Sequence, residues 1–254
     1  MMDIEAKDKL STAIAEASKA GEREARKRDI EKGLAVVDAI LSSTDAEFAS
    51  RQFILGKVLE FGIGRNPWKN MAGWIRHQNT STFGLMQIPT EFADFLVHLA
   101  RLDIRTAVEI GVFSGASSYL ICAVLQRANP DVEYVMVDIE DKLIGFDAFA
   151  KRLNLRKMVP ATSHHCVGQE YDFVFIDADH SYRGVKNDWL NVGRHARKAV
   201  AFHDIHAHEY DAKEGGVVRA WNEVKAALVS DHMVLEFAHN PVRWMGLGLA
   251  IRQG

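Results

Sequence analysis

The chain is 254 residues long, carries a formal net charge of −3 at pH 7, and is 48% hydrophobic. This length allows one large domain, or one domain with an extension, and the hydrophobic content is sufficient for a packed core. The nearly balanced charge gives no reason to expect a nucleic-acid or membrane surface. No run of about 18 apolar residues occurs, so no membrane-spanning helix is expected.

The first residues and the cysteine content favour a cytoplasmic location. The amino-terminal sequence has no basic stretch followed by an apolar one, as a secretory signal would. The two cysteines, Cys122 and Cys166, fall in different predicted elements. Cys122 lies in an apolar helical segment, where a small buried side chain is expected. We therefore expect a reduced, cytoplasmic protein.

Residues 1–85 are predicted to form a helical extension followed by a lid or loop region. Residues 3–60 are rich in Ala, Glu, Lys and Arg, and the stretch 20–29 carries both signs of charge, as a solvated helix face does. Residues 61–68 contain two Gly and one Pro, which indicates a loop. We expect the extension to cover an acceptor pocket or to form a homodimer contact. Three side chains are expected to line that pocket or to anchor the extension: Trp68, Trp74 and His77.

The next helix is predicted to begin after Thr90, whose hydroxyl is a suitable N-cap for the apolar residues that follow. From about residue 104 the chain alternates between strand and helix patterns. Strands are predicted at 106–111, 133–138, 157–161, 172–177 and 198–203. Helices are predicted at 115–128, 145–154, 182–192 and 216–229.

The predicted strands are continuous apolar runs, which is typical of a parallel sheet with helices covering both faces. The chain ends differently, because two strands at 233–237 and 244–251 are joined by a short loop. A short loop permits antiparallel pairing but not a parallel crossover. The sequence therefore predicts an α/β fold with a mostly parallel seven-stranded sheet and a carboxyl-terminal antiparallel hairpin.

The segment 106–118 carries the most informative pattern in the chain. A short apolar strand runs into Gly111-x-x-x-Gly115 and then into a helix. Glycines let the backbone approach a ligand closely, and the first turn of a helix offers free N–H groups. The dinucleotide fingerprint G-x-G-x-x-G is absent because position 113 is Phe. This pattern points away from NAD and towards S-adenosylmethionine.

Four segments carry a resemblance to a known family: Glu109–Gly115, Val137–Glu140, Tyr171–Tyr182 and Ala201–Ile205. Through them, the chain from about residue 86 to residue 251 resembles a class I S-adenosylmethionine-dependent methyltransferase. The most similar group contains small-molecule and sugar O-methyltransferases and cephalosporin-hydroxylase-like proteins. The resemblance implies a Rossmann-like domain over residues 86–254, after the extension of residues 1–85.

The resemblance implies S-adenosylmethionine as the cofactor and assigns residues to it. Asp138, which ends the second strand of the domain, would accept both ribose hydroxyls, and Glu109 would orient the backbone or the amino-acid head. A Cβ at Gly111 is expected to intrude on the ligand. Ser114 and Ser117 would bond the head carboxylate or cap the helix that starts there. The predicted cofactor-binding residues are Glu109, Gly111, Ser114, Gly115, Ser117, Asp138 and Asp177.

Three further assignments complete the predicted cofactor site. Glu140 is an alternative to Asp138 as the acceptor of the ribose hydroxyls; if it does not have this role, it is expected to be an exposed loop carboxylate. Thr162 and Ser163, after the third strand of the domain, are expected to lie by the adenine. Residues 83–89 lead into the core and are expected to close over the cofactor.

Carboxylates and imidazoles follow two neighbouring predicted strands, at the edge where open α/β sheets bind ligands. Carboxylates that converge there are unfavourable unless a positive group joins them. A divalent cation with oxygen ligands meets this need, and Mg²⁺ fits best. The residues concerned are Asp177, Asp179, His180, His203 and Asp204.

The resemblance implies that Asp177 and Asp204 hold the magnesium ion. Ile205 follows Asp204 where the family has an amide or acid ligand, so we expect Asp179 or His206 to supply the third ligand. The alternatives are substrate or cofactor contact without a metal, and capping of the next helix.

The predicted catalytic residues are His203, His180 and Asp177. Either imidazole is a candidate general base, because histidine titrates near neutral pH, and either could instead be structural. His203 is preferred because it precedes Asp204 at a strand end.

The predicted function is O-methylation of a hydroxyl on a small molecule or sugar-containing metabolite, with assistance from Mg²⁺. The alternatives are a metal-dependent hydroxylase or hydrolase-like enzyme on the same scaffold, and a non-catalytic cofactor-binding partner protein. A nucleic-acid acceptor is not expected, because the chain is not basic and lacks an Asn/Asp-Pro-Pro-aromatic tetrad.

Overall fold

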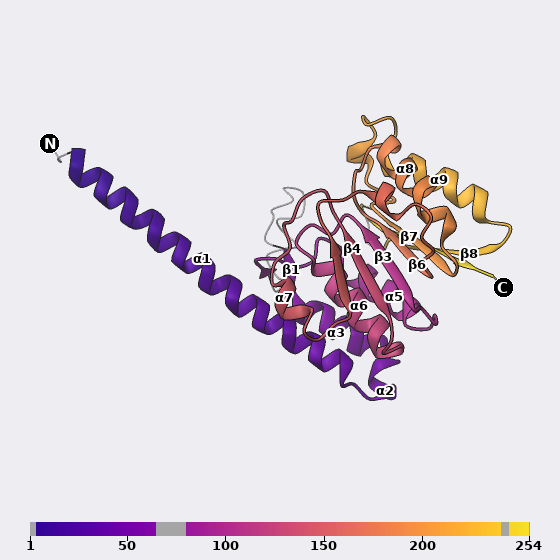
Figure 1. The fold of residues 1–254 in the computed structure, drawn as a ribbon, viewed down its shortest axis with the longest axis horizontal. Coiled ribbons are helices and arrows are strands. Elements are labelled where there is room, and N and C mark those ends of the chain that lie inside the picture. The colour runs from indigo at the N-terminus through magenta and orange to yellow at the C-terminus, as the bar shows by residue number, and fades with distance from the viewer. Residues whose placement is uncertain (1–3, 65–79, 240–243, 254) are drawn as a thin grey trace.

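Helices cover both faces of a seven-stranded sheet in the computed structural model (Figure 1), which describes residues 4–64, 80–239 and 244–253. The helices are α1 (Ile4–Leu41), α2 (Asp45–Phe48), α3 (Arg51–Phe61), α5 (Pro89–Leu99), α6 (Ala116–Ala128), α7 (Phe146–Phe149), α8 (Tyr182–Asn191) and α9 (Gly216–Leu228). The strands of this sheet are β3 (Thr106–Ile110), β4 (Glu133–Val137), β5 (Leu155–Met158), β6 (Phe173–Ile176), β7 (Ala199–His203), β8 (His232–Phe237) and β9 (Leu247–Arg252). A separate two-stranded sheet pairs β1 (Ile63–Gly64) with β2 (Thr80–Ser81).

The strand order is β5-β4-β3-β6-β7-β9-β8. The first five strands in this order are parallel, and β9 pairs antiparallel with both β7 and β8. The predicted α/β fold with its carboxyl-terminal hairpin is therefore confirmed. The reversal from β3 to β6 is a topological switch point, and ligands bind outside the carboxyl ends of the strands at such points.

Each central strand sends alternate side chains into two hydrophobic clusters, one on each face of the sheet. In β6, Phe173 and Phe175 pack with α5, α6 and the extension, whereas Val174 and Ile176 pack with α8 and α9. All four residues are buried, because helices cover both faces.

The strand β5 begins and ends two to three residues earlier than predicted. Leu155 pairs with Tyr134 and the ladder ends at Met158, before Pro160. Proline lacks the N–H that a ladder requires, so the apolar run at 157–161 could not continue as a strand. The exposed Arg156 and Lys157 of this edge strand also gave no apolar signal in the sequence.

The helix α5 shows that the predicted N-cap at Thr90 is wrong. Its N-cap is Ile88, with Pro89 in the first turn and no side-chain cap. Proline suits the first helical position because its φ is already helical and its missing N–H is not needed there. The apolar stripe that motivated the prediction is nevertheless buried: Phe92, Phe95, Leu96 and Leu99.

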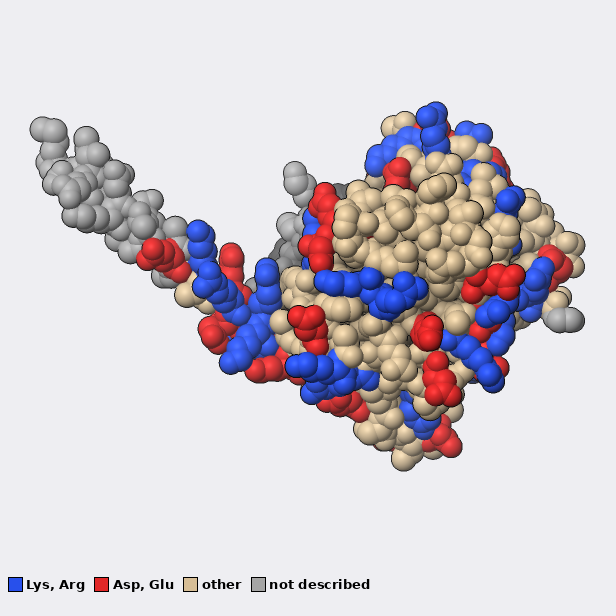
Figure 2. Space-filling model, viewed as in Figure 1, with Lys and Arg blue, Asp and Glu red and all other residues tan. Residues whose placement is uncertain are grey.

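The extension is anchored by one end of its long helix. The amino-terminal part of α1 projects away from the sheet (Figure 1), while Val36, Val37 and Ile40 near its other end join the same core as Ile54 and Val58 of α3. On the face seen in Figure 2, acidic and basic side chains alternate over the described part of α1. The predicted homodimer contact through this extension stays a prediction.

Two further expectations concern the extension. Trp68, Trp74 and His77 lie outside the described residues. Within the described part of the chain, no helix is both long and apolar enough to cross a membrane.

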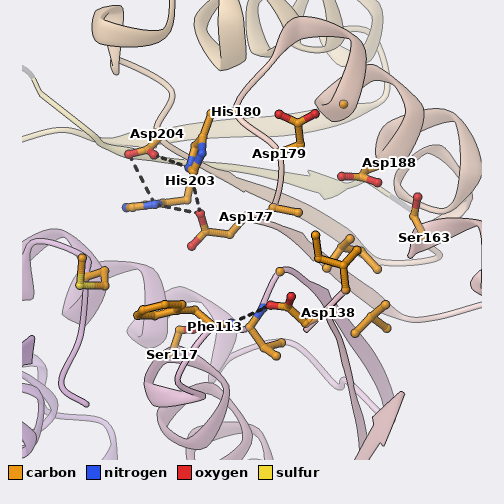
Figure 3. Close-up of a pocket in the computed structure, with 18 of the residues that line it drawn as sticks. Phe113, Ser117, Asp138, Ser163, Asp177, Asp179, His180, Asp188, His203 and Asp204 are labelled. Carbon is orange, nitrogen blue, oxygen red and sulfur yellow. Dashed lines mark hydrogen bonds and ion pairs between the residues drawn. The ribbon is translucent and has the colours of Figure 1, made fainter. Parts of the chain in front are cut away.

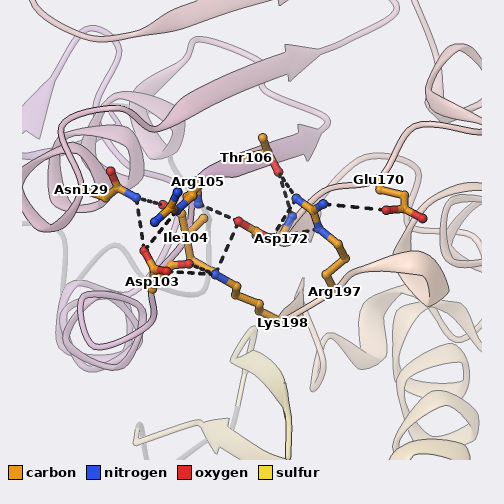
Figure 4. Close-up of polar contacts among 9 residues, drawn as sticks. All are labelled: Asp103, Ile104, Arg105, Thr106, Asn129, Glu170, Asp172, Arg197 and Lys198. Atoms are coloured by element: carbon orange, nitrogen blue, oxygen red, sulfur yellow. Dashed lines mark hydrogen bonds and ion pairs between the residues drawn. The ribbon is translucent and has the colours of Figure 1, made fainter. Parts of the chain in front are cut away.

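A polar network ties together the amino-terminal ends of β3, β6 and β7 (Figure 4). Asp172, only 3% exposed, accepts hydrogen bonds from the backbone N–H of Arg105 (2.8 Å) and from Nε of Arg197 (3.0 Å). Lys198 lies 3.7 Å from the same carboxylate, and Thr106 Oγ1 accepts from the Arg197 guanidinium. This network fixes the strands at the edge opposite to the ligand-binding end of the sheet.

Candidate functional site

A cavity of about 1110 Å³ opens at the carboxyl ends of β3, β4, β6 and β7 (Figure 3). One end is formed by the turn between β3 and α6, the end of β4, and the loop after β5. The other end contains carboxylates and imidazoles from the ends of β6 and β7. Most of the predicted site residues line this cavity: Gly111, Ser114, Ser117, Asp138, Asp177, Asp179, His180, His203 and Asp204.

Asp138 organises the glycine turn. Its Oδ2 accepts hydrogen bonds from the backbone N–H groups of Val112 and Phe113, both at 2.9 Å, and Oδ1 accepts from the N–H of Glu140 at 3.1 Å. These contacts hold Phe113 at a positive φ of 45°, which a bulky residue rarely adopts without support. Asp138 also faces the cavity, so one carboxylate both shapes the turn and is available at the predicted ribose position.

The protein backbone itself requires glycine at position 111, and the predicted contact of Gly111 with a ligand stays a prediction. Its φ is +87°, and a Cβ built there would overlap the carbonyl oxygen of Asp177 and approach Cα of Ala178. The turn after β3 thus lies directly against the end of β6. Gly115, at φ +89°, meets a different obstacle, because a Cβ would lie 2.7 Å from the ring of Tyr119.

Glu109, predicted to orient the backbone or the amino-acid head of the cofactor, is buried and is not among the residues that line the cavity. The side chain is fully buried, and its carboxylate accepts hydrogen bonds from Ser117 (2.6 Å), Ser118 and the hydroxyl of Tyr134 (2.8 Å). Burial raises the pKa of Glu109 to about 7, although the three hydroxyl hydrogen bonds oppose the shift. Glu109 therefore supports Ser117 from below, and Ser117 faces the cavity.

Replacing Glu109 by Gln is expected to remove a pH-dependent loss of stability. The pKa of Glu109 is about 7 in the folded chain and near 4.5 in the unfolded chain, so the folded state binds more protons between these values. Wild-type stability should thus fall by about 3 kcal/mol as the pH rises from 4.5 to 7. Urea unfolding of the wild type and of Glu109→Gln at pH 5 and pH 8 measures this change. Other groups titrate equally in both proteins, so their contribution cancels when the two are compared. If the difference in unfolding free energy between Glu109→Gln and the wild type is the same at both pH values, the raised pKa of Glu109 is refuted.

The segment before α5 closes one wall of the cavity. Ser114 Oγ donates to the carbonyl of Phe83 at 3.2 Å, which joins the glycine turn to this segment. Gln87 is 3% exposed and donates from Nε2 to Asp177 Oδ2 at 3.0 Å, whereas its buried Oε1 has no hydrogen-bond partner among the described residues. Gln87 was missed as a site residue, although the segment 83–89 itself was expected to close over the cofactor. An unpaired buried oxygen at a cavity wall is an acceptor for a ligand N–H or O–H.

Two carboxylates and two imidazoles meet at the other end of the cavity. His180 Nε2 lies 2.9 Å from Asp204 Oδ2 and 3.9 Å from Asp177 Oδ1. His203 Nδ1 lies 3.2 Å from Asp177 Oδ1 and 3.5 Å from Asp204 Oδ1. Asp204 has a positive φ of 61°, a backbone conformation that turns its carboxylate back towards β6. We call these four residues, shown in Figure 3, the Asp–His cluster.

The charges in the Asp–His cluster stabilise one another. Burial lowers the pKa of His203, but the carboxylates of Asp177 and Asp204 outweigh it and raise this pKa to about 9. The pKa of His180 is raised, because the hydrogen bond to Asp204 and the charge of Asp177 outweigh burial. The pKa of Asp204 is lowered, because the two imidazoles outweigh its desolvation. Without another cation, the imidazoles supply the positive charge that the carboxylates need.

The residue that joins Asp177 and Asp204 in space is His180, whereas the sequence led us to expect Asp179 or His206 there. Ligand atoms of Asp177, His180 and Asp204 lie within 4.8 Å of one another, which is the spacing a metal site requires. Asp179 is not part of this group, because its carboxylate accepts hydrogen bonds from the N–H and hydroxyl of Ser181, which caps α8. His206 is directed towards Glu236, at 3.8 Å. The sequence predicted His180 as a general base or a structural histidine, and not as a metal ligand.

The comparisons with known proteins identify the domain. Residues 108–205 match a family model described as a methyltransferase domain. An O-methyltransferase from Bacillus cereus, solved in complex with SAH, is 15% identical, with 85% of this chain and 95% of that chain covered and a TM-score of 0.50. The O-methyltransferase TomG from Streptomyces achromogenes, solved with SAM, is 18% identical, with 79% and 90% covered and a TM-score of 0.49. No curated protein matches this chain.

The family match confirms a methyltransferase domain over the residues that carry most of the sequence motifs. Its limits, 108 and 205, include the glycine turn and the whole Asp–His cluster. The Bacillus cereus structure confirms the Rossmann-like methyltransferase fold.

Proposed function

We propose that this chain, whose residues 108–205 match a methyltransferase domain, is an S-adenosylmethionine-dependent O-methyltransferase acting on a small hydroxylated molecule. One observation carries the proposal: a single cavity joins the glycine turn and Asp138 to the Asp–His cluster. A cofactor at the first end and an acceptor hydroxyl at the second would meet within this one cavity. Methyl transfer needs this alignment of oxygen, carbon and sulfur, and positioning supplies much of the acceleration.

The glycine-turn end of the cavity suits the cofactor. S-adenosylmethionine, when bound, supplies an electrophilic methyl group on a sulfonium. The amino end of α6 offers backbone N–H groups next to Ser114 and Ser117, which suits a carboxylate. Asp138 is available for the ribose hydroxyls, and Gln87 Oε1 offers an acceptor opposite. Phe113 and Ile139 are 53% and 66% exposed at this end, and a bound adenosyl group would cover apolar surface there.

The Asp–His cluster suits a divalent cation. Asp177, His180 and Asp204 present two carboxylate oxygens and one imidazole nitrogen within the required spacing. A cation held there supplies positive charge that favours the ionised form of an acceptor hydroxyl. Gln87 and His203 both contact Asp177 and would fix its orientation. A set with one nitrogen ligand admits Mn²⁺ as readily as Mg²⁺, so the choice of ion is left to experiment.

The acceptor end of the cavity is partly aromatic. Tyr210 stacks on the ring of His180, with centroids 4.3 Å apart and planes at 14°. Lys213 lies 5.1 Å from the Tyr210 ring, and Trp244 donates from its indole N–H to Glu209. All of these residues line the cavity. An acceptor with a planar or ring-shaped body and a free hydroxyl fits this wall.

Replacing Asp138 by Ala is expected to weaken binding of S-adenosylhomocysteine at least about 30-fold, because both the ribose acceptor and the support of Val112 and Phe113 are lost. Isothermal calorimetry with S-adenosylhomocysteine measures this. The matched control is Glu140→Ala, which removes an exposed carboxylate paired with Lys142 and should change affinity less than about 3-fold. If wild type does not bind, the proposed function is wrong; if Glu140→Ala has the larger effect, the ribose assignment is wrong.

A further inference from the structure

A second buried carboxylate lines the cavity, at the end opposite to the Asp–His cluster. Asp188 of α8 is 8% exposed and faces the cavity together with Ser163 (Figure 3). Ser163, 3% exposed, accepts a hydrogen bond from Nδ2 of Asn191 at 3.0 Å, which leaves its own proton free for Asp188. In the described part of the chain no Lys, Arg or His forms an ion pair with Asp188, and the hydroxyl of Ser163 is the one side-chain group that favours its ionised form.

This arrangement leaves Asp188 short of hydrogen-bond donors. A carboxylate has about four acceptor positions, and a single serine proton fills one of them. Burial raises the pKa of Asp188 to about 6, the Ser163 hydrogen bond opposes the shift, and the charge of Asp179 adds to it. A buried carboxylate of this kind needs a donor from elsewhere, and the cavity is the side from which a ligand can supply one.

The position in the cavity indicates which ligand group would supply the donor, given the proposed function, on which this assignment rests. An adenosyl group with its ribose at Asp138 and its amino-acid head over the glycine turn extends its base beyond β4. There the wall is formed by Ile139, by Ala161 and Ser163 of the loop after β5, and by Asp188. Ile139 and Ala161 are apolar, as the face of a flat base requires, and Ser163 and Asp188 are polar, as its edge requires.

We propose that Asp188 accepts a hydrogen bond from the exocyclic amino group of the cofactor's adenine. Ser163 and Asn191 are the positioning residues, because their hydrogen-bond chain fixes the carboxylate from behind. The site thereby distinguishes adenine from a base that carries a carbonyl oxygen at the same position. An oxygen placed against the carboxylate offers no proton and repels it, so a buried polar pair would be left unsatisfied.

The test compares S-adenosylhomocysteine with S-inosylhomocysteine, which has a carbonyl oxygen in place of the amino group. Calorimetry on the wild-type protein should show at least about 50-fold weaker binding of the inosine compound. Asp188→Asn, whose amide can both donate and accept, should reduce this preference to less than about 5-fold. Ser163→Ala should reduce it in part, because the carboxylate loses its support. The matched control is Asp211→Asn, an exposed position outside the cavity, which should retain the full preference.

The outcomes separate this inference from the proposed function. If the wild type binds neither compound, the proposed function fails. If it binds both with equal affinity, the cofactor site stands and the role of Asp188 is refuted without any variant. An unchanged preference in a folded Asp188→Asn protein, verified by its melting curve, would equally overturn the inference. If that variant does not fold, the wild-type ratio and Ser163→Ala decide the question.

Discussion

Replacing Asp204 by Asn is expected to lower methyl transfer at least about 100-fold while leaving the affinity for S-adenosylhomocysteine within about 3-fold of wild type. Asp204 is buried, lies 2.9 Å from His180 and 3.5 Å from His203, and shares the proposed cation with Asp177. The amide keeps the shape of the carboxylate but removes the charge that holds the cation and both imidazoles. The cofactor end of the cavity is built from β3, β4 and the loop after β5, so it should be largely unaffected.

The measurement is transfer of a labelled methyl group from S-adenosylmethionine to a panel of hydroxylated aromatic and sugar compounds. Calorimetric titration with Mn²⁺ should show that Asp204→Asn has lost the cation. Asp211→Asn is the matched control, because it makes the same chemical change at an exposed carboxylate that contacts His208. Wild-type turnover in Asp204→Asn would refute the role of the Asp–His cluster in the reaction.

A chelator distinguishes the two forms of the mechanism. If EDTA abolishes turnover and Mn²⁺ or Mg²⁺ restores it, the cation prepares the acceptor hydroxyl. If EDTA has no effect, the cation is absent from the reaction, and proton removal falls to the unprotonated form of His203 or His180, which the neighbouring carboxylates disfavour. Turnover of an acceptor that depends on a cation but yields no methylated product would favour the hydroxylase or hydrolase-like alternative.

The fold was predictable wherever one local signal determined the structure. β3, β6 and β7 are buried on both faces, so they appear in the sequence as mainly apolar runs, interrupted in β3 by the buried Glu109. The short loop before β9 forces antiparallel pairing. β5 is an edge strand with exposed Arg156 and Lys157 in its middle, so the apolar residues that follow them led to a predicted strand two to three residues too late. Its register depends on the hydrogen bonds offered by β4, which the local sequence does not encode.

The sequence was sufficient to predict which segments form the candidate site, but not which side chains within it contact one another. Carboxyl ends of neighbouring parallel strands must meet, and this rule alone places Asp177, His203 and Asp204 together. Whether His180 or Asp179 joins them depends on the path of the chain after β6. Ser181 caps α8, its N–H and hydroxyl engage Asp179, and His180 is left to turn towards Asp204. Gln87 comes from a segment 90 residues before Asp177, and no spacing rule links the two.

The tightness of the glycine turn arises from the pairing of two strands. β3 and β6 are hydrogen-bonded neighbours, and the N–H of Asp177 donates to the carbonyl of Ile110. The chain must then turn away from β6 at Gly111 within one residue, with φ at +87°. The glycine turn and Asp177, the first residue of the Asp–His cluster, are therefore in direct backbone contact. A change in one must displace the other, whichever ligand is bound.

Replacing Gly111 by Ala is accordingly expected to cost at least about 3 kcal/mol of folding stability, or to prevent folding, and to abolish binding of S-adenosylhomocysteine. Two contributions to this loss of stability add. The left-handed φ costs an alanine about 1–2 kcal/mol, and the new Cβ overlaps the backbone carbonyl of Asp177. Gly168 separates them, because its φ is +79° but a Cβ there would meet nothing within 4 Å. Urea unfolding of Gly168→Ala should therefore show only the first contribution, with cofactor binding unchanged. Equal losses of stability in the two variants would mean that backbone conformation alone, and not the contact with β6, selects glycine at position 111.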